Sequence, residues 1–325
     1  PQAIWQSIGV YMNDQYKISE KTLLQAGLRY NQFILKADFD TTFYPFPFTE
    51  ANIDNGSLTG SAGIVFRPTD KWVISSNAAT AFRSPNVDDV GKVFDSEPGS
   101  VVIPNPNLEA EYAYNVDLNV AKMFGKIVKI DVSTYYTLLD NALVRRDFTL
   151  NGASEIVYDG ELSQVQAIQN AAKANVYGIQ AGVEVKLPTG FRFSTDLNFQ
   201  KGEEELDNGD KSPSRHAAPF FGISRVGYVN SKLDLEVNLQ FSDEVAYEDL
   251  AEEEKGKKEI YAIDGNGNPY SPSWYTLNLK SMYKLTENFT LTAGLENITD
   301  QRYRPYSSGI VAPGKNFILA LRAKF

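Results

Sequence analysis

The sequence predicts an all-β fold, a transmembrane antiparallel β-barrel, from three observations. Segments of about ten residues alternate apolar and polar side chains, so each has one apolar and one polar face. The polar positions hold Asp, Glu, Lys, Arg, Asn and Gln in mid-strand, which the core of a soluble β-sandwich would not accept unpaired. Tight turns alternate with long connections, which is the pattern of bacterial outer-membrane barrels.

The expected strands follow one another along most of the chain. In chain order they are 5–16, 24–30, 58–66, 72–83, 112–121, 128–138, 177–187, 191–200, 218–228, 233–242, 275–285, 289–295 and 317–325. Tight turns are expected at 19–21, 68–71, 124–125, 188–190, 229–231 and 286–288, and the connections between them run from about a dozen to about thirty residues. In the first long connection, Pro45 and Pro47 cannot donate to a ladder.

This count gives about 13 strands, whereas closed single-chain bacterial barrels have even numbers. Either the count is wrong by one strand, or the chain is the C-terminal part of a larger barrel. On either interpretation the apolar faces are expected to meet lipid and the polar faces an aqueous lumen. Aromatic residues at strand ends, such as Phe191 and Phe199 or Tyr275 and Tyr283, are expected at the two membrane interfaces.

Composition excludes several function classes. The 325 residues contain no Cys, so neither a disulfide nor a thiolate metal site exists, and the single His216 argues against His-based zinc sites and catalytic triads. The net charge of -10 argues against nucleic acid as a partner. No phosphate-binding loop or nucleophile elbow occurs, so we expect no enzyme, no catalytic residue and no cofactor.

The final strand, 317–325, has the clearest alternation. Its odd positions are Phe, Leu, Leu, Ala and Phe, while the even positions include Arg322 and Lys324. An amphipathic last strand that ends in Phe resembles the C-terminal signature of outer-membrane barrels. We therefore expect Phe325 to act as a barrel-assembly signal.

Two longer motifs carry a family resemblance. The first pairs AFRSPN at 81–86 with PNPNLEAE at 104–111, at the start and end of one long connection; the second is GLENITDQRY at 294–303, before the last strand. Together they resemble the TonB-dependent outer-membrane receptors, specifically the C-terminal part of their 22-stranded barrel. The resemblance covers essentially the whole chain but does not specify the substrate.

The resemblance implies a function that this chain performs only with further parts. It implies active uptake of a scarce nutrient across the bacterial outer membrane, by default a ferric siderophore, with long loops extracellular and short turns periplasmic. Residues 1–325 are then a single barrel segment without signal peptide or plug domain. The expected partners are outer-membrane lipid, the missing plug and first strands, a TonB-type energy-coupling protein that acts through the missing part, and surface or periplasmic lipoproteins. The alternatives are a haem receptor, and a passive porin-like channel or scaffold subunit.

The resemblance also suggests site residues. The loop motif comprises Phe82, Arg83, Pro85, Asn105, Pro106, Leu108 and Glu111, which either anchor the loop or contact ligand directly. Arg and aromatic side chains in extracellular loops suit a ferric siderophore, and the candidates are Arg83, Asn86, Arg145, Arg146, Tyr158, Tyr261 and Tyr270.

Metal sites are not expected. The sequence 264–268 has the start of a calcium-binding loop, but Pro269 and Tyr275 occupy positions that require Gly and Glu. The acidic runs Glu203–Glu205 and Glu252–Glu254 are interpreted as solvated loop segments rather than cation sites.

Overall fold

Thirteen long strands form one antiparallel meander in the computed structural model, which describes residues 2–40, 42, 48–91, 93–97, 99–206, 209–215 and 217–325. Each long strand pairs with the next long strand along the chain. They are β1 (Gln2–Ser19), β2 (Thr22–Asp38), β3 (Glu50–Phe66), β4 (Trp72–Arg83), β7 (Glu111–Phe124), β8 (Val128–Asp147), β10 (Glu161–Lys186), β11 (Phe191–Glu205), β13 (Phe221–Val229), β14 (Leu233–Ser242), β17 (Trp274–Lys284), β18 (Phe289–Glu296) and β19 (Asn316–Ala323).

Six further strands are short and lie in the long connections. They are β5 (Phe94–Glu97), β6 (Ser100–Ile103), β9 (Glu155–Tyr158), β12 (Lys211–Pro213), β15 (Ala262–Ile263) and β16 (Pro269–Tyr270), accompanied by the helical turns α1 (Val87–Gly91), η1 (Tyr247–Asp249) and η2 (Glu252–Glu254). The described chain therefore has 19 strands, not the 13 expected, because segments of two to four residues are too short to show an alternation. Within the described ranges, no helix combines the length and apolar character needed to cross a membrane.

The strands are also longer than the sequence predicts. β8 has 20 residues and β10 has 26, so most of the stretch 141–171, expected as a connection, is strand. This part of β10 pairs with β6, β8 and β9 and packs an apolar cluster of Val101, Ile103 and Val165. Its side chains meet other parts of the protein, so its sequence lacks the alternation that predicts a membrane strand.

The register brings like faces together. Asn238 lies opposite Arg225 and Asn278, whereas Val237 lies opposite Val226 and Leu279. Cross-strand partners point to the same side of a sheet, so the strands build one polar face and one apolar face, as predicted. Large apolar side chains are widely exposed on the apolar face, for example Val226 at 56%, and lipid is the environment that suits such a surface.

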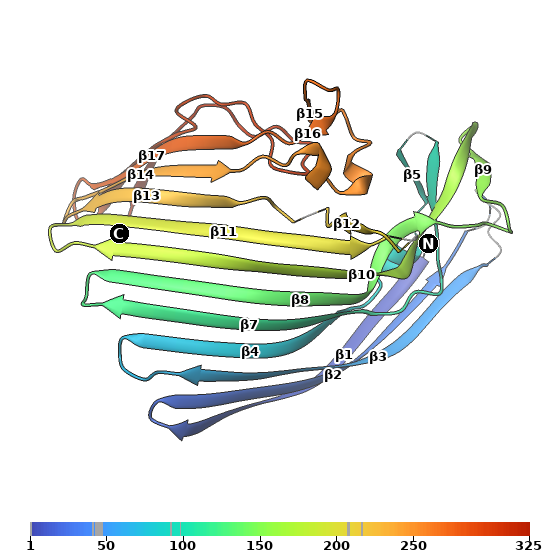
Figure 1. Cartoon of the computed structure of the whole chain (residues 1–325), viewed down its shortest axis with the longest axis horizontal. Coiled ribbons are helices and arrows are strands. Elements are labelled where there is room, and N and C mark those ends of the chain that lie inside the picture. Colours follow the sequence, from blue (N-terminus) through green and yellow to red (C-terminus); the bar gives the residue numbers. More distant parts are fainter. Residues whose placement is uncertain are drawn as a thin grey trace.

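The two ends of the sheet differ (Figure 1). The six tight turns lie at one end, here called the turn end, and the six long connections lie at the other, the loop end. At the loop end, Phe33, Leu35 and Ile53 on the polar face of β2 and β3 are buried against Val90 and Leu108 of the connection between β4 and β7. Five of the six tight turns contain Gly, Pro or Asn, which commonly interrupt strands, whereas the turn at 19–21 is a short polar segment of Ser, Glu and Lys.

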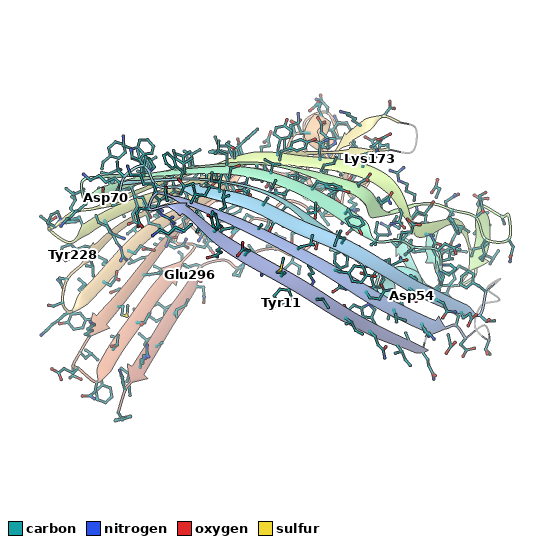
Figure 2. The ribbon with its side chains drawn as sticks, turned by 90° about the horizontal axis from the view of Figure 1, so that it is seen from below. Tyr11, Asp54, Asp70, Lys173, Tyr228 and Glu296 are labelled. Atoms are coloured by element: carbon teal, nitrogen blue, oxygen red, sulfur yellow. The ribbon has the colours of Figure 1, made fainter. Side chains whose placement is uncertain are left out.

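The sheet has two free edges. Figure 2 shows it as a curved surface, with Tyr11 on its first strand and Glu296 on its last but one. Among the described residues, β1 pairs only with β2 and β19 only with β18, and every residue of both edge strands is exposed. Unpaired backbone groups cost several kcal/mol each in hydrocarbon, so a membrane sheet of this form needs a pairing partner at each edge.

Candidate functional site

The connection between β4 and β7, here called the motif loop, has its two sequence motifs at its two ends, here called its feet. At the first foot, charged side chains join three strands. The Arg83 guanidinium donates to both carboxylate oxygens of Asp89 at 2.8 Å and lies 3.4 Å from Glu111 Oε1. The second oxygen of Glu111 accepts the backbone N–H of Leu143 at 2.8 Å. One carboxylate thus ties β7 to β4 and β8, and Arg83 is held by two partners.

Asn86 caps the helical turn that follows. Its Oδ1 accepts the backbone N–H groups of Asp88 and Asp89 at 2.8 and 3.0 Å, and the Asp89 carboxylate accepts the Asn86 N–H at 2.9 Å. This reciprocal arrangement satisfies the exposed donors at the start of α1. The carbonyl group of Asn86 is therefore engaged within the loop.

The second foot is buried rather than solvated. Asn105 Nδ2 donates to the carbonyl of Ile168 on β10 at 2.8 Å, and its Oδ1 accepts the N–H of Asn107. Leu108 is buried in the apolar cluster with Phe82 packed against it; Pro85 and Pro104 are fully buried, and Pro106 is half-buried. The structure thus brings the motif residues together as an anchor of the loop, and direct ligand contact at these positions stays a prediction.

The remaining predicted residues lie on separate connections. Arg146 donates to the carbonyl of Glu205 at 2.5 Å, Arg145 is half-buried next to it, and Tyr158 packs against the cluster around Val101. Tyr261 and Tyr270 belong to the connection between β14 and β17, where Tyr270 pairs with Ala262. Within the described residues, no hydrogen bond, ion pair or ring contact given by the structure joins these two groups. His216 lies outside the described residues.

Glu254 is a buried carboxylate in the connection between β14 and β17. Its side chain is fully buried, lies 2.6 Å from Arg215 Nε and 2.8 Å from Lys257 Nζ, and accepts a hydrogen bond from the Tyr261 hydroxyl group. Arg215 comes from the preceding long connection, so the ion pair ties two connections together. Tyr261, predicted as a ligand contact, is used here as a hydrogen-bond donor.

The ionisation of this cluster is shifted by its surroundings. Burial alone raises the pKa of Glu254, but hydrogen bonds from Lys257 and Tyr261 and the charges of Lys257 and Arg215 outweigh it, so the pKa lies below the ordinary value. Burial and the neighbouring Glu254 carboxylate raise the pKa of the Tyr261 hydroxyl. Glu254 is therefore an anion and Tyr261 a neutral donor at physiological pH.

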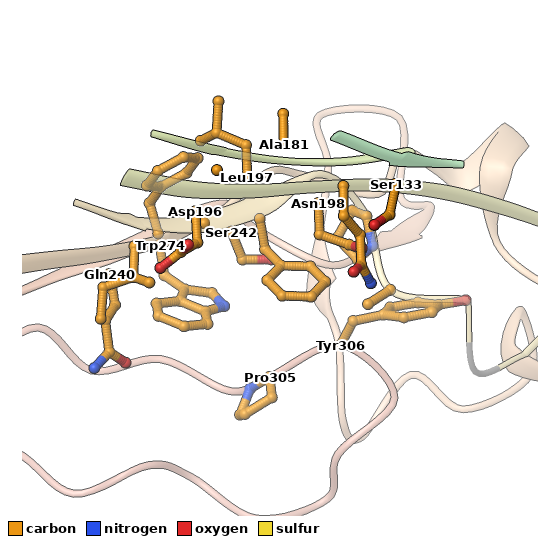
Figure 3. Close-up of a pocket in the computed structure, with 18 of the residues that line it drawn as sticks. Ser133, Ala181, Asp196, Leu197, Asn198, Gln240, Ser242, Trp274, Pro305 and Tyr306 are labelled. Atoms are coloured by element: carbon orange, nitrogen blue, oxygen red, sulfur yellow. The ribbon is translucent and has the colours of Figure 1, made fainter. Parts of the chain in front are cut away.

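A cavity of about 640 Å³ lies on the polar face near the loop end of the shorter strands (Figure 3). Its floor follows the register: Ser133, Gln180, Asn198, Phe221, Ser242 and Trp274 form one cross-strand row from β8 to β17. The neighbouring row contributes Asp131, Asp196 and Gln240. Pro305 and Tyr306, from the connection between β18 and β19, form the opposite wall, while Ala181 and Leu197 point away (Figure 3).

The wall formed by this last connection is held by Asn297. Its backbone N–H donates to Asn278 Oδ1 at 2.8 Å, and its side chain bonds Gln301 and the carbonyl of Pro313. Asn297 has a φ of 45°, a left-handed conformation that Asn tolerates better than most residues. The second sequence motif therefore shapes the cavity, because it ends in Tyr303, whose ring stacks on Trp274 at 4.2 Å.

Sequence reasoning missed the cavity residues. The alternation places Asn198 and Gln240 on the polar faces of their strands. Only the strand register shows that Asn198 lies in the same cross-strand row as Trp274 and that Gln240 lies in the neighbouring row. Pro272 and Trp274 at a strand start, and Tyr303 within the motif, were the available signals. The described residues include no group of three or more His, Cys, Asp or Glu side chains suited to a metal ion, and Asp264 caps its own turn by accepting the N–H groups of Asn266 and Asn268.

Comparisons with known proteins agree on one family. A family model described as TonB dependent receptor-like, beta-barrel matches residues 6–298. The probable TonB-dependent siderophore receptor PiuA of Acinetobacter baumannii is 22% identical, over 98% of this chain and 41% of its own length. The hemoglobin and hemoglobin-haptoglobin-binding protein of Haemophilus ducreyi is 25% identical, over 76% of this chain and 27% of its own length.

Solved structures show the same fold. The copper transporter OprC superposes with a TM-score of 0.77 at 15% identity, covering 99% of this chain and 48% of that one. The chain thus spans less than half the length of each of these three relatives. The predicted resemblance is confirmed, and the chain belongs to the TonB-dependent receptor β-barrel family of the outer membrane.

Proposed function

We propose that residues 1–325 form one barrel segment of an outer-membrane receptor that takes up a ferric siderophore, energised through a TonB-type coupling protein. The observation that carries this proposal is the receptor-barrel match over residues 6–298, joined by a siderophore receptor that is similar over 98% of the chain. The proposal places the loop end outside the cell and the turn end in the periplasm.

The structure supports a receptor built from more than the described sheet. Both edges are free among the described residues, and the polar face carries ion pairs such as Arg192–Asp234 at 2.6 Å. Further strands that close the sheet would turn this face into a lumen, and a plug within it would prevent passive flow. Outer-membrane lipid, the missing plug and strands, the TonB-type protein and associated lipoproteins are the proposed partners.

Haem or haemoglobin is the second candidate, because a haemoglobin-binding relative matches 76% of the chain. The chain itself favours it less. Haem iron can be held by His, and this chain has a single His. Its His216 stands alone, and the motif connection at 84–109 contains none.

Iron-dependent growth tests the proposal. Cells that lack the receptor gene, with and without a plasmid copy, are grown on a ferric siderophore, on haem or on haemoglobin as sole iron source. We expect the plasmid copy to restore growth on a ferric siderophore only, and to require the TonB-type protein. Restored growth on haem alone would move the assignment to the second candidate, and steady ion conductance in planar bilayers would indicate a passive channel instead.

A further inference from the structure

Lys122 is a cation on the apolar face of the sheet. The register places it opposite Trp72 on β4 and Ile130 on β8, close to the turn end. Over the half of each long strand nearest that end, no other described position of the apolar face is Lys or Arg. A cation on a surface that meets hydrocarbon is unfavourable, so Lys122 needs a compensating partner.

Two aromatic rings flank the Lys122 side chain. Its Nζ lies 4.4 Å from the ring centroid of Trp72 and 4.4 Å from that of Phe124. Both distances are well within the range of about 6 Å over which a ring attracts a cation. The backbone supports this arrangement, because the Met123 N–H donates to the Lys71 carbonyl at 2.8 Å and so ties the end of β7 to the start of β4. The ammonium group is thus held between two rings at one place on the apolar face.

The ammonium group has no carboxylate partner in the described chain. Among the described residues, the structure gives neither the Lys122 side chain nor the Trp72 indole N–H an ion pair or a hydrogen bond. Asp14 is the one described carboxylate on the turn-end half of the apolar face, and β2 and β3 separate its strand from β4. Aromatic rings stabilise a cation without neutralising it, so these donors are free to meet an anionic acceptor.

The neighbouring turns add positive charge. The segments 67–72 and 122–127 contain four basic side chains and one acidic side chain, Asp70, so their net charge is +3, whereas the whole chain carries -10. Asp70 marks this end of the sheet in Figure 2. Basic side chains at a membrane surface attract anionic lipid headgroups, so the local charge complements an anionic lipid.

From these observations we propose that Lys122, Trp72 and Phe124 form a binding site for the phosphate group of an anionic glycerophospholipid. The Lys122 ammonium group and the Trp72 indole N–H donate to phosphate and glycerol-ester oxygens, while the acyl chains lie against the apolar face around Ile74 and Ile130. A zwitterionic headgroup carries an ammonium group that the basic turns repel, so the site favours a net negative headgroup. In the orientation of the proposed function, this lipid belongs to the periplasmic leaflet.

Quenching of Trp72 fluorescence by brominated lipids tests the site in the intact receptor. A receptor variant that retains only this Trp is placed in nanodiscs of phosphatidylcholine that contain dibrominated phosphatidylglycerol or, in a parallel series, dibrominated phosphatidylcholine. We expect phosphatidylglycerol to occupy the position next to Trp72 with about fivefold preference. Lys122→Met, which places an apolar side chain on the apolar face, should lower this preference below about twofold, and Lys122→Arg should retain it.

Lys284→Met is the matched control. Lys284 also lies at the turn end, but on the same side of β17 as Asn278 of the polar face, so its replacement should leave the preference unchanged. Equal quenching by the two lipids in the receptor that keeps Lys122 would overturn the site, and this comparison needs no substitution at Lys122. An unchanged preference in Lys122→Met would also overturn it and would assign the attraction to the basic turns as a whole. Growth on a ferric siderophore tests the uptake proposal separately from either result.

Discussion

Replacement of Glu254 by Gln tests whether one buried carboxylate holds the connection between β14 and β17. The substitution keeps the shape and removes the charge, leaving Arg215 and Lys257 opposite a neutral amide. Removing one partner of a buried ion pair costs about 3–5 kcal/mol. Arg215 and Lys257 keep 33% and 21% of their side-chain surface exposed, so water compensates part of the loss. We expect the substitution to lower the free energy of opening this connection by about 2–3 kcal/mol, which makes the opening about 30- to 150-fold more frequent.

Hydrogen exchange of the intact receptor in detergent measures this opening directly. The amides of Leu250 and Glu254, which are bonded within the helical turns, should exchange faster by that factor in the variant. Glu252→Gln is the matched control, since Glu252 lies in the same turn, is 62% exposed and pairs only with Lys255 in the described chain. Its effect should stay below about fivefold. Equal exchange in the two variants would refute the reasoning.

Three further predictions concern the same connections and the last strand. Because the pKa of Glu254 is lowered in the folded protein, its contribution to stability is fully present above the ordinary carboxyl pKa of about 4.3 and is lost as pH falls through the lower folded value. The free energy of opening, taken from exchange rates corrected for the intrinsic pH dependence of amide exchange, should therefore fall only below about pH 4 in wild type and show no such transition in Glu254→Gln. Asn297→Ala removes the bonds that hold the last long connection and should cost about 2–4 kcal/mol, seen as a red shift of Trp274 fluorescence; an unchanged spectrum in a variant that retains only this Trp would contradict it. Phe325→Ala should lower the amount of receptor in the outer membrane without changing ligand affinity, and a normal amount would argue against Phe325 as an assembly signal.

The loop motif shows which features of a loop its own sequence predicts and which depend on distant residues. Prolines and flanking polar residues at 84–86 and 104–111 predict the two feet of a loop, and both feet are ordered in the described structure. Their anchoring depends on distant partners: Asn105 bonds the Ile168 carbonyl and Glu111 bonds the Leu143 N–H. No pattern within the motif specifies those partners, because they are set by which strands become neighbours.

The periodicity of the sequence by itself determined the fold class, the two faces of the sheet and the six tight turns. Side-chain alternation is a local property, so the sequence of each strand alone shows which residues lie on its polar face and which on its apolar face. Only the tertiary structure decided the short strands, the length of β10, the buried Glu254 and the cavity around Asn198. Each of these depends on residues that register and loop packing bring together: Glu254 meets Arg215 from another connection, and Asn198 shares a row with Trp274 three strands away.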